Sequence, residues 1–382
     1  MSGGPLTGIK VVELAGIGPA PFACMMLADM GAEVIQVERL EPSGLGSASD
    51  PRKRISNRGR RSIALDLKKP EAIAIVQRFV ADADILVEGY RPGVAERLGM
   101  GPDECLQRNP RLVYGRMTGW GQDGPLSQSA AHDLNFIAVT GALHAIGPAG
   151  GPPVSPLNYV GDFGGGSLYL VAGVLAALVE ARSSGRGQVV DAAIVDGAMS
   201  LSSFMFTQIA NGTWSHERGS NLADGGRPWY DIYETSDGKF VSLAAIEGKF
   251  YNQFLGLVGL NPATLPAQND PAGWPELRER LAALFRSRTR EEWAQLLEGT
   301  DSCFAPVLTA EEAFDHPHVR ARDILVDRGG VIQPAPAPRF SRTPSRIGAE
   351  PVPAGTHGSE LLVQAGYTAQ EIDRLRSEGV VA

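Results

Sequence analysis

The amino-acid sequence predicts an α/β protein, in which a parallel sheet flanked by helices is followed by a smaller α+β module. Short β-branched runs alternate with helical segments through the N-terminal half, which is the pattern of βαβ units. After a polar, glycine-rich stretch at 212–228 this alternation gives way to a hairpin and amphipathic helices. The chain has 382 residues, against about 100–150 for a typical domain, so two domains are expected.

The first elements form a βαβ unit. Residues 9–14 are β-branched and followed by glycine, which predicts a buried strand. The turn AGIGPAP leads into a predicted helix at 22–30, which Gly31 ends, and a second strand follows at 32–37. Two parallel strands joined by a helix imply a right-handed crossover.

The alternation continues with a helix at 71–81 and strands at 84–88 and 112–117. The helix predicted at 164–181 is apolar nearly all round, so we expect it to be buried on most faces. Its longest apolar run, 168–179, is too short to span a bilayer.

The second module begins with a predicted hairpin, formed by strands at 230–234 and 239–245 around the turn TSDG. Amphipathic helices follow near 248–259, 275–286 and 290–298. The proline-rich stretch at 333–346 has few backbone donors, so we expect it to run extended over a surface.

Composition excludes several classes of protein. Hydrophobic residues make up 43% and charged residues 20%, as in soluble globular proteins, which excludes a disordered chain. The net charge of −8 argues against a general nucleic-acid binder. The three cysteines lack metal-ligand spacing, so no metal site and a reduced compartment are expected. Neither end carries a secretory or peroxisomal signal, so a cytoplasmic protein without a membrane partner is expected.

Cations gather where predicted strands end. The segment 52–61 holds six of them and is either a solvated basic loop or a phosphate site. Arg39 and Arg91 follow two predicted strands, and open α/β sheets bind ligands at the carboxyl ends of their strands. Cations converging there would suit a ligand with more than one phosphate.

The first βα turn has two glycines of a dinucleotide-binding motif, Gly16 and Gly18, and Glu38 follows after the second strand. Pro21 replaces the third glycine, which normally allows helix and strand to pack closely. We therefore expect a structural turn rather than an NAD site.

Two residues have the character of acid/base groups. His132 lies in the sequence AHDLNF after a polar loop. Asp162 precedes the glycines that open the helix predicted at 164–181. It either caps that helix or lies beside backbone N–H groups that hold a developing oxyanion, and one carboxyl could do both.

Eight motifs in this order resemble the family III CoA transferases: VVELAGIGPAP, GAEVIQVER, LDLK, VEGYRPG, GRMTGWGQDGP, HDLNF, VGDFGGGS and SSGRGQVVDAAIVDG. The similarity runs from about residue 5 to near 346 and is greatest to the α-methylacyl-CoA racemase branch. It implies a Rossmann-like large domain at 1–215, a small α+β domain at 225–320, and a C-terminal segment at 321–382 that returns to the large domain. It also implies an interlocked homodimer, with active sites between the large domain of one chain and the small domain of the other.

The resemblance further implies the site residues. His132 and Asp162 match the two catalytic positions, and Glu247 matches an acid that orients the histidine across the dimer. The positions that match CoA contacts are Arg39, Leu65, Asp66, Leu67, Lys68, Gly89 and Arg91. Those that match residues along the thioester are Ala131, Asp133, Leu134, Asn135 and Phe136.

The racemase branch is the preferred match. Ala131 departs from it, since a glycine usually stands there, whereas the transferase branch lacks a histidine matching His132. A racemase removes the proton alpha to a thioester from one face and returns it on the other, which requires two acid/base groups. CoA then arrives as part of the substrate, and no metal or redox cofactor is expected.

Two alternatives remain open. The first is acyl-CoA:carboxylate CoA transfer with Asp162 as the nucleophile. The second is a non-catalytic subunit that binds CoA esters.

Overall fold

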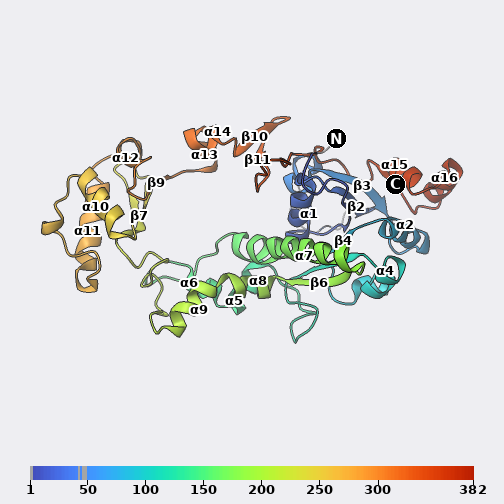
Figure 1. The fold of residues 1–382 in the computed structure, drawn as a ribbon, viewed down its shortest axis with the longest axis horizontal. Coiled ribbons are helices and arrows are strands. Elements are labelled where there is room, and N and C mark those ends of the chain that lie inside the picture. The colour runs from blue at the N-terminus through green and yellow to red at the C-terminus, as the bar shows by residue number, and fades with distance from the viewer. Residues whose placement is uncertain (1–2, 42–43, 45–49) are drawn as a thin grey trace. The chain divides into compact units, whose positions relative to one another are not determined.

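The computed structural model describes residues 3–41, 44 and 50–382 (Figure 1). The described chain folds into two compact units. The first comprises Met1–Ala142, Pro156–Ser203 and Ile324–Ala382, and the second comprises Leu143–Ser155 and Phe204–Asp323. Residues 143–155 thus belong to the second unit, although they lie within the range 1–215 expected for the large domain.

The described part of the first unit contains a six-stranded, all-parallel sheet with the strand order β3-β2-β1-β4-β5-β6. The strands are β1 (Lys10–Leu14), β2 (Glu33–Arg39), β3 (Arg60–Leu65), β4 (Ile85–Glu88), β5 (Val113–Thr118) and β6 (Gln188–Ala193). This is the order of the Rossmann fold, whose ligand-binding crevice lies where the order reverses, between β1 and β4. The predicted parallel sheet is therefore confirmed.

Helices cover both faces of this sheet. They are α1 (Pro19–Asp29), α2 (Pro70–Ala81), α3 (Val94–Arg97), α4 (Pro102–Arg108), α5 (Asp133–Val139), α7 (Leu168–Ser184), α8 (Ile194–Leu201), α15 (Gly358–Gln364) and α16 (Ala369–Ser377). Successive strand residues point to opposite faces. Val11 accordingly packs in one buried cluster with Leu27 of α1, and Val12 packs in the other with Ile75 of α2.

The interpretation of residues 52–61 as a solvated loop or a phosphate site is wrong for two of its arginines. Arg58 and Arg60 are buried. The Nε of Arg58 donates to Asp29 (3.0 Å), and that of Arg60 donates to Glu13 (3.0 Å). Arg60 opens β3, a strand that the sequence analysis did not predict, and its side chain ties that strand to β1.

The long apolar helix also differs from its prediction. A π-helix, η3 (Tyr159–Ser167), precedes α7, and its N-cap is Asn158. Asp162 therefore lies within the helical segment and is not its cap. Among the described residues, the stretch Tyr159–Ser184 is long and apolar enough to cross a membrane, a test that core helices of soluble proteins also pass. Here α7 packs along β5 and β6.

The second unit contains an antiparallel sheet of β7 (Tyr230–Glu234), β8 (Phe240–Ala244) and β9 (Phe304–Val307). Glu234 pairs with Phe240, so the predicted hairpin is confirmed. Its helices are α10 (Gly248–Leu257), α11 (Trp274–Phe285), α12 (Arg290–Leu297), α13 (Ala310–Asp315) and α14 (Pro317–Ala321), while α6 (Ala142–Ala145) and α9 (Ser203–Ala210) begin at the unit boundaries. Phe285 and Trp293 are at the centre of its aromatic core.

The C-terminal segment belongs to the first unit. It begins with a hairpin of β10 (Leu325–Arg328) and β11 (Val331–Pro334), and the proline-rich stretch after β11 contains no further strand. Near the end of the chain, Val381 pairs with Leu65 at the edge of β3. The tail thereby covers the last residue of that strand.

Candidate active site

Three cations predicted to contact CoA lie at the carboxyl ends of β2, β3 and β4, strands on the two sides of β1. Arg39 is the last residue of β2, Lys68 follows β3 and Arg91 follows β4, and all three are exposed. Burial raises the pKa of the Tyr90 phenol, and the positive charge of Arg39 opposes that rise, which shows that Arg39 lies near Tyr90. These strand ends flank the crevice between β1 and β4, where a polyanion would meet several positive charges.

The segment Leu65–Lys68, which is predicted to contact CoA, is held in place by burial of Leu65 and by hydrogen bonds of Asp66. Leu65 is only 1% exposed, so its side chain supports the turn rather than facing a ligand. The N–H of Asp66 donates to the carbonyl of Val380 (3.0 Å), and Oδ1 of Asp66 accepts the N–H of Lys68 (3.2 Å). Asp66 and Leu67 are half-buried, which leaves Lys68 as the exposed member of this segment.

His132 is the N-cap of α5, and its side chain is exposed. Its backbone N–H donates to Oδ1 of Asn135 (3.1 Å), and its carbonyl accepts the N–H of Asn135 (2.8 Å). One turn on, Phe136 is buried and meets the ring of Trp120 edge-on at 4.8 Å. Of the residues expected along the thioester, Asn135 and Phe136 therefore fix the start of α5. Leu134 is 45% exposed and free to contact a ligand.

Asp162 faces the first βα turn. A Cβ added to Gly18 would lie 3.2 Å from Oδ2 of Asp162, and Gly18 has φ +70°, a conformation that favours glycine. The stacked rings of Phe22 and Phe163, 4.4 Å apart, hold η3 against α1. The turn considered as a dinucleotide site thus borders the predicted catalytic carboxylate. Glu38, the acid of that motif, accepts a hydrogen bond from Ser62 instead.

Burial raises the pKa of Asp162 to about 6, and the negative charge of Asp133 adds to the rise. The positive charge of His132 and a hydrogen bond from Asn158 act in the opposite direction. A carboxyl with this pKa can both take up and release a proton near neutral pH. His132 acts on this carboxyl electrostatically, and the residue after it, Asp133, accepts the backbone N–H of Asp162 (2.6 Å), so the two predicted catalytic residues lie near one another.

The family model of CoA-transferase family III matches residues 6–358. The chain belongs to this family. It is 44% identical to the α-methylacyl-CoA racemase of Mus musculus and 40% identical to that of Homo sapiens, each match covering 98% of this chain and 97% of the relative. The crystal structure of a CAIB/BAIF family protein from Brucella suis is similar with a TM-score of 0.81 at 25% identity, over 95% of this chain and all of the other.

The glycines after Asp162 serve helix packing in this member of CoA-transferase family III. A Cβ on Gly165 would lie 2.7 Å from the backbone nitrogen of Ala198 in α8. One on Gly166 would lie 3.0 Å from the side chain of Ile194. Both glycines are buried, whereas Gly164 is half-buried, and a role of the backbone N–H groups near Asp162 in holding an oxyanion stays a prediction.

Glu247, the third predicted catalytic residue, lies in the second unit. It is the N-cap of α10, is exposed and makes no side-chain capping hydrogen bond. Its carboxylate is therefore available to another group. Among residues 3–41, 44 and 50–382, no cluster of His, Cys, Asp and Glu could hold a metal ion.

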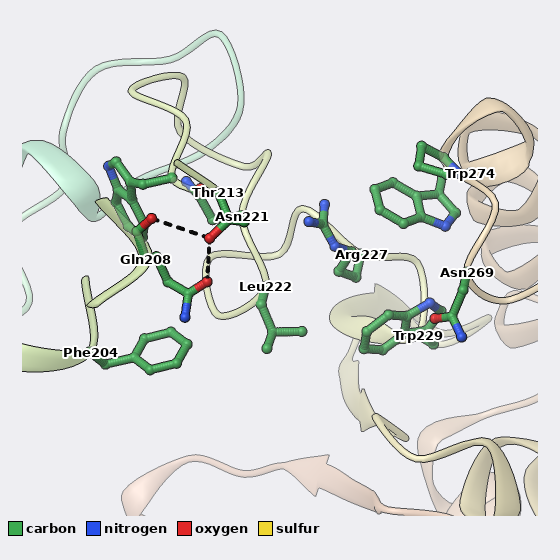
Figure 2. A pocket seen from close by; sticks show the side chains of 11 residues that line it. Phe204, Gln208, Thr213, Asn221, Leu222, Arg227, Trp229, Asn269 and Trp274 are labelled. Atoms are coloured by element: carbon green, nitrogen blue, oxygen red, sulfur yellow. Dashed lines mark hydrogen bonds between the residues drawn. The ribbon is translucent and has the colours of Figure 1, made fainter. Parts of the chain in front are cut away.

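The second unit has a pocket of its own, of about 330 Å³ (Figure 2). The guanidinium of Arg227 lies 4.1 Å above the ring of Trp274, and on the other side Thr213 donates to Oε1 of Gln208 (2.7 Å). The predicted site residues are not among those that line this pocket.

The raised pKa of Asp162 predicts a stability effect. Between pH 3.8 and about 6 the folded state holds a proton that the unfolded state has released, so stability falls as the pH rises through this window. Asp162→Asn removes this titration. It should gain about 1 kcal/mol over the native protein at pH 8 but nothing at pH 3, after allowance for solvent screening at a half-exposed group.

Urea unfolding at the two pH values measures this difference. Asp103→Asn, on the exposed first turn of α4, is the matched control and should show no such pH-dependent gain. Equal stability of Asp162→Asn and the native protein at pH 8 would contradict the raised pKa.

Proposed function

We propose that the protein is an α-methylacyl-CoA racemase, which interconverts (2R)- and (2S)-2-methylacyl-CoA thioesters. The observation that carries this proposal is the pairing of His132 with Asp162, a carboxyl whose pKa is raised to about 6. The 44% identity to the mouse racemase supports the same reaction. Because the transferase branch is expected to lack the histidine, the pair favours a racemase over a transferase.

The reaction is a 1,1-proton transfer. Neutral His132 takes the α proton of the S epimer, and the electrons of the C–H bond move into the thioester as an enolate. Protonated Asp162 then delivers a proton to the other face of the carbon, which forms the R epimer. The reverse reaction exchanges the two roles. In either direction, one member of the pair is protonated and the other is not when the reaction begins. No cofactor takes part, since CoA is a part of the substrate.

CoA would bind at the carboxyl ends of β2, β3 and β4, where its phosphates meet Arg39, Lys68 and Arg91. Arg39→Ala and Arg91→Ala should each raise KM about tenfold with kcat nearly unchanged, since a phosphate contact binds substrate and transition state alike. Steady-state kinetics measures the split. Arg111 is exposed and precedes β5, so it lies at the amino end of a strand rather than at the carboxyl ends. Arg111→Ala should therefore change neither KM nor kcat. If Arg39→Ala and Arg91→Ala behave like Arg111→Ala, the phosphates lie elsewhere.

We also propose the interlocked homodimer, in which Glu247 of one chain orients His132 of the other. Large apolar side chains are exposed on α7, α8 and α9, among them Val179 (68%), Leu201 (50%) and Phe204 (50%). Large apolar side chains with this much exposure are typical of surfaces that a partner covers. The free carboxylate of Glu247 suits a group supplied by a partner.

Mixed dimers test this arrangement. His132→Ala and Glu247→Ala chains should each be nearly inactive alone. In a dimer of one chain of each kind, one site has both defects and the other has none. A random mixture should therefore recover about a quarter of native activity if the sites are shared between chains. No recovery, or an active monomer in sedimentation, would contradict the shared site.

The function itself is tested by incubating (2S)-2-methylacyl-CoA esters in deuterated water and analysing the chirality of the product. Appearance of deuterated R epimer supports a racemase. A second arm supplies a free carboxylate as acceptor, and transfer of CoA to it without inversion would support the transferase with Asp162 as nucleophile. Sterol side-chain, branched fatty acyl and arylpropionyl esters make up the panel, because the sequence does not specify the acyl group.

We propose a cytoplasmic location. The cysteines Cys24, Cys105 and Cys303 are all free thiols, which suits a reducing compartment. Cell fractionation tests this location.

A further inference from the structure

We infer that Asp133 is a positioning residue, which joins the two acid/base groups: it follows His132 directly in the chain, and its carboxylate binds the backbone of Asp162. This inference rests on the proposed racemase function. It replaces the thioester contact that the resemblance implies for Asp133 with a role behind the reacting groups.

The orientation of the Asp133 side chain is the first evidence for this role. It is the first residue of α5, between the exposed side chains of His132 and Leu134, yet it is only 8% exposed. Its Oδ2 accepts the backbone N–H of Asp162 at 2.6 Å. The N–H of Gly161 also donates to this carboxylate. One buried side chain thus ties the start of α5 to the turn that carries Asp162.

Gly161 leaves room for this contact. A Cβ at position 161 would lie 2.3 Å from Oδ2 and 2.7 Å from Cγ of Asp133. A larger residue would push the carboxylate away from the N–H of Asp162. The absence of a side chain at Gly161 therefore allows the Asp133 carboxylate to reach the N–H of Asp162.

The helix η3 needs such a partner. The first N–H groups of any helix lack partners within it. The hydrogen bond from the N–H of Phe163 to the carbonyl of Asn158 (3.2 Å) spans five residues, so the preceding N–H groups have no carbonyl to bind. Asn158 makes no side-chain capping hydrogen bond. Asp133 takes the place of the cap from a neighbouring helix and fixes the backbone from which the Asp162 carboxyl projects.

The charge of Asp133 has a second effect. Its Oδ1 is buried and has no hydrogen-bond partner in the described part of the chain, so its charge is poorly screened. The charged groups that act on Asp162 are Asp133, which raises its pKa, and His132, which lowers it. Removal of the charge at 133 should therefore make Asp162 a stronger acid.

Two substitutions separate position from charge. Asp133→Ala removes both, and we expect kcat to fall about 100-fold with KM within about threefold, since small displacements of a catalytic group have effects of this size. Asp133→Asn keeps an oxygen for the N–H of Asp162. It should stay within about tenfold of native kcat. With the R epimer as substrate, for which Asp162 is the base, the acid limb of the kcat/KM profile should move to lower pH. Asp103→Ala, also an aspartate in the first turn of a helix, is the matched control for the loss of a charge there.

Gly161→Ala provides a second route if Asp133→Ala does not fold, as judged by circular dichroism. It displaces the carboxylate while Asp133 stays in the chain, so kcat should again fall with little change in KM. The inference is overturned if Gly161→Ala keeps native kcat. It is also overturned if Asp133→Asn loses as much activity as Asp133→Ala with an unmoved acid limb, because that is the behaviour of a purely structural residue.

A measurement without substrate keeps this test apart from that of the proposed function. The carboxyl of Asp162 is titrated by ¹³C NMR in the free protein and assigned by its absence in Asp162→Asn. Its midpoint should move to lower pH in Asp133→Asn whether or not the protein racemises anything. An unmoved midpoint contradicts the electrostatic role of Asp133, whereas a native protein that exchanges no α hydrogen contradicts the racemase.

Discussion

His132→Ala and Asp162→Ala should each slow racemisation strongly while each retains hydrogen exchange with one epimer. In deuterated water, His132→Ala leaves Asp162 to exchange the α hydrogen of the R epimer slowly and without inversion. Asp162→Ala leaves His132 to exchange the S epimer alone. The loss in racemisation should be on the order of 10²–10⁴, the usual contribution of a general acid or base. Chiral chromatography with mass spectrometry follows both quantities.

A one-base mechanism gives a different pattern, in which one variant loses all exchange and the other almost none. Full racemisation by His132→Ala would make the histidine structural. The transferase with Asp162 as nucleophile would then be the better explanation of the site. Thermal unfolding of both variants checks that the fold is retained.

Strands with short apolar runs could be predicted from the sequence even where they contain a buried charge, as β1 does at Glu13, whereas β3 could not. Short β-branched runs identified β1, β2, β4 and β5 within one or two residues. β3 begins with Arg60, Arg61 and Ser62, which resemble a surface loop until the partners of the buried Arg60 and Ser62 are known. Those partners, Glu13 for the arginine and Glu38 for the serine, lie on β1 and β2. A polar strand of this kind is visible only in the folded sheet.

The candidate site, too, could be predicted only in part from the sequence. His132 and Asp162 could be singled out as individual candidates by residue type and by the motifs around them. Their pairing could not, because it depends on how α5 packs against η3. The orientation of Asp133 was also beyond the sequence, since an aspartate in the first turn of a helix usually faces solvent. The glycines after Asp162 suggested an anion site, whereas two of them allow α8 to approach closely.

Loss of Arg60 should have the largest effect on stability. The side chains of Arg60 and Glu13 are 1% and 0% exposed. Arg60 also donates to the carbonyls of Ser56, Arg58 (3.0 Å) and Pro21. Arg60→Met would leave Glu13 charged and buried without its partner, so the free energy of unfolding should fall by about 3–5 kcal/mol. Urea unfolding followed by circular dichroism measures the loss.

A double substitution, and a substitution of the neighbouring residue Arg61, show whether the loss comes from the buried ion pair. Glu13→Leu combined with Arg60→Met removes both charges and should recover most of the lost stability, because a well-packed apolar pair can replace a buried ion pair. Arg61→Met breaks only surface contacts, the ion pair with Glu360 (3.0 Å) and a hydrogen bond to Gln364 (2.9 Å), and should change stability by less than about 1 kcal/mol. Pro21 follows the turn that faces Asp162, so the hydrogen bond from Arg60 to the Pro21 carbonyl also fixes the backbone beside the candidate site. A loss for Arg60→Met as small as that for Arg61→Met would show that water reaches the Glu13 carboxylate, and the ion pair would then not be what fixes β3 to β1.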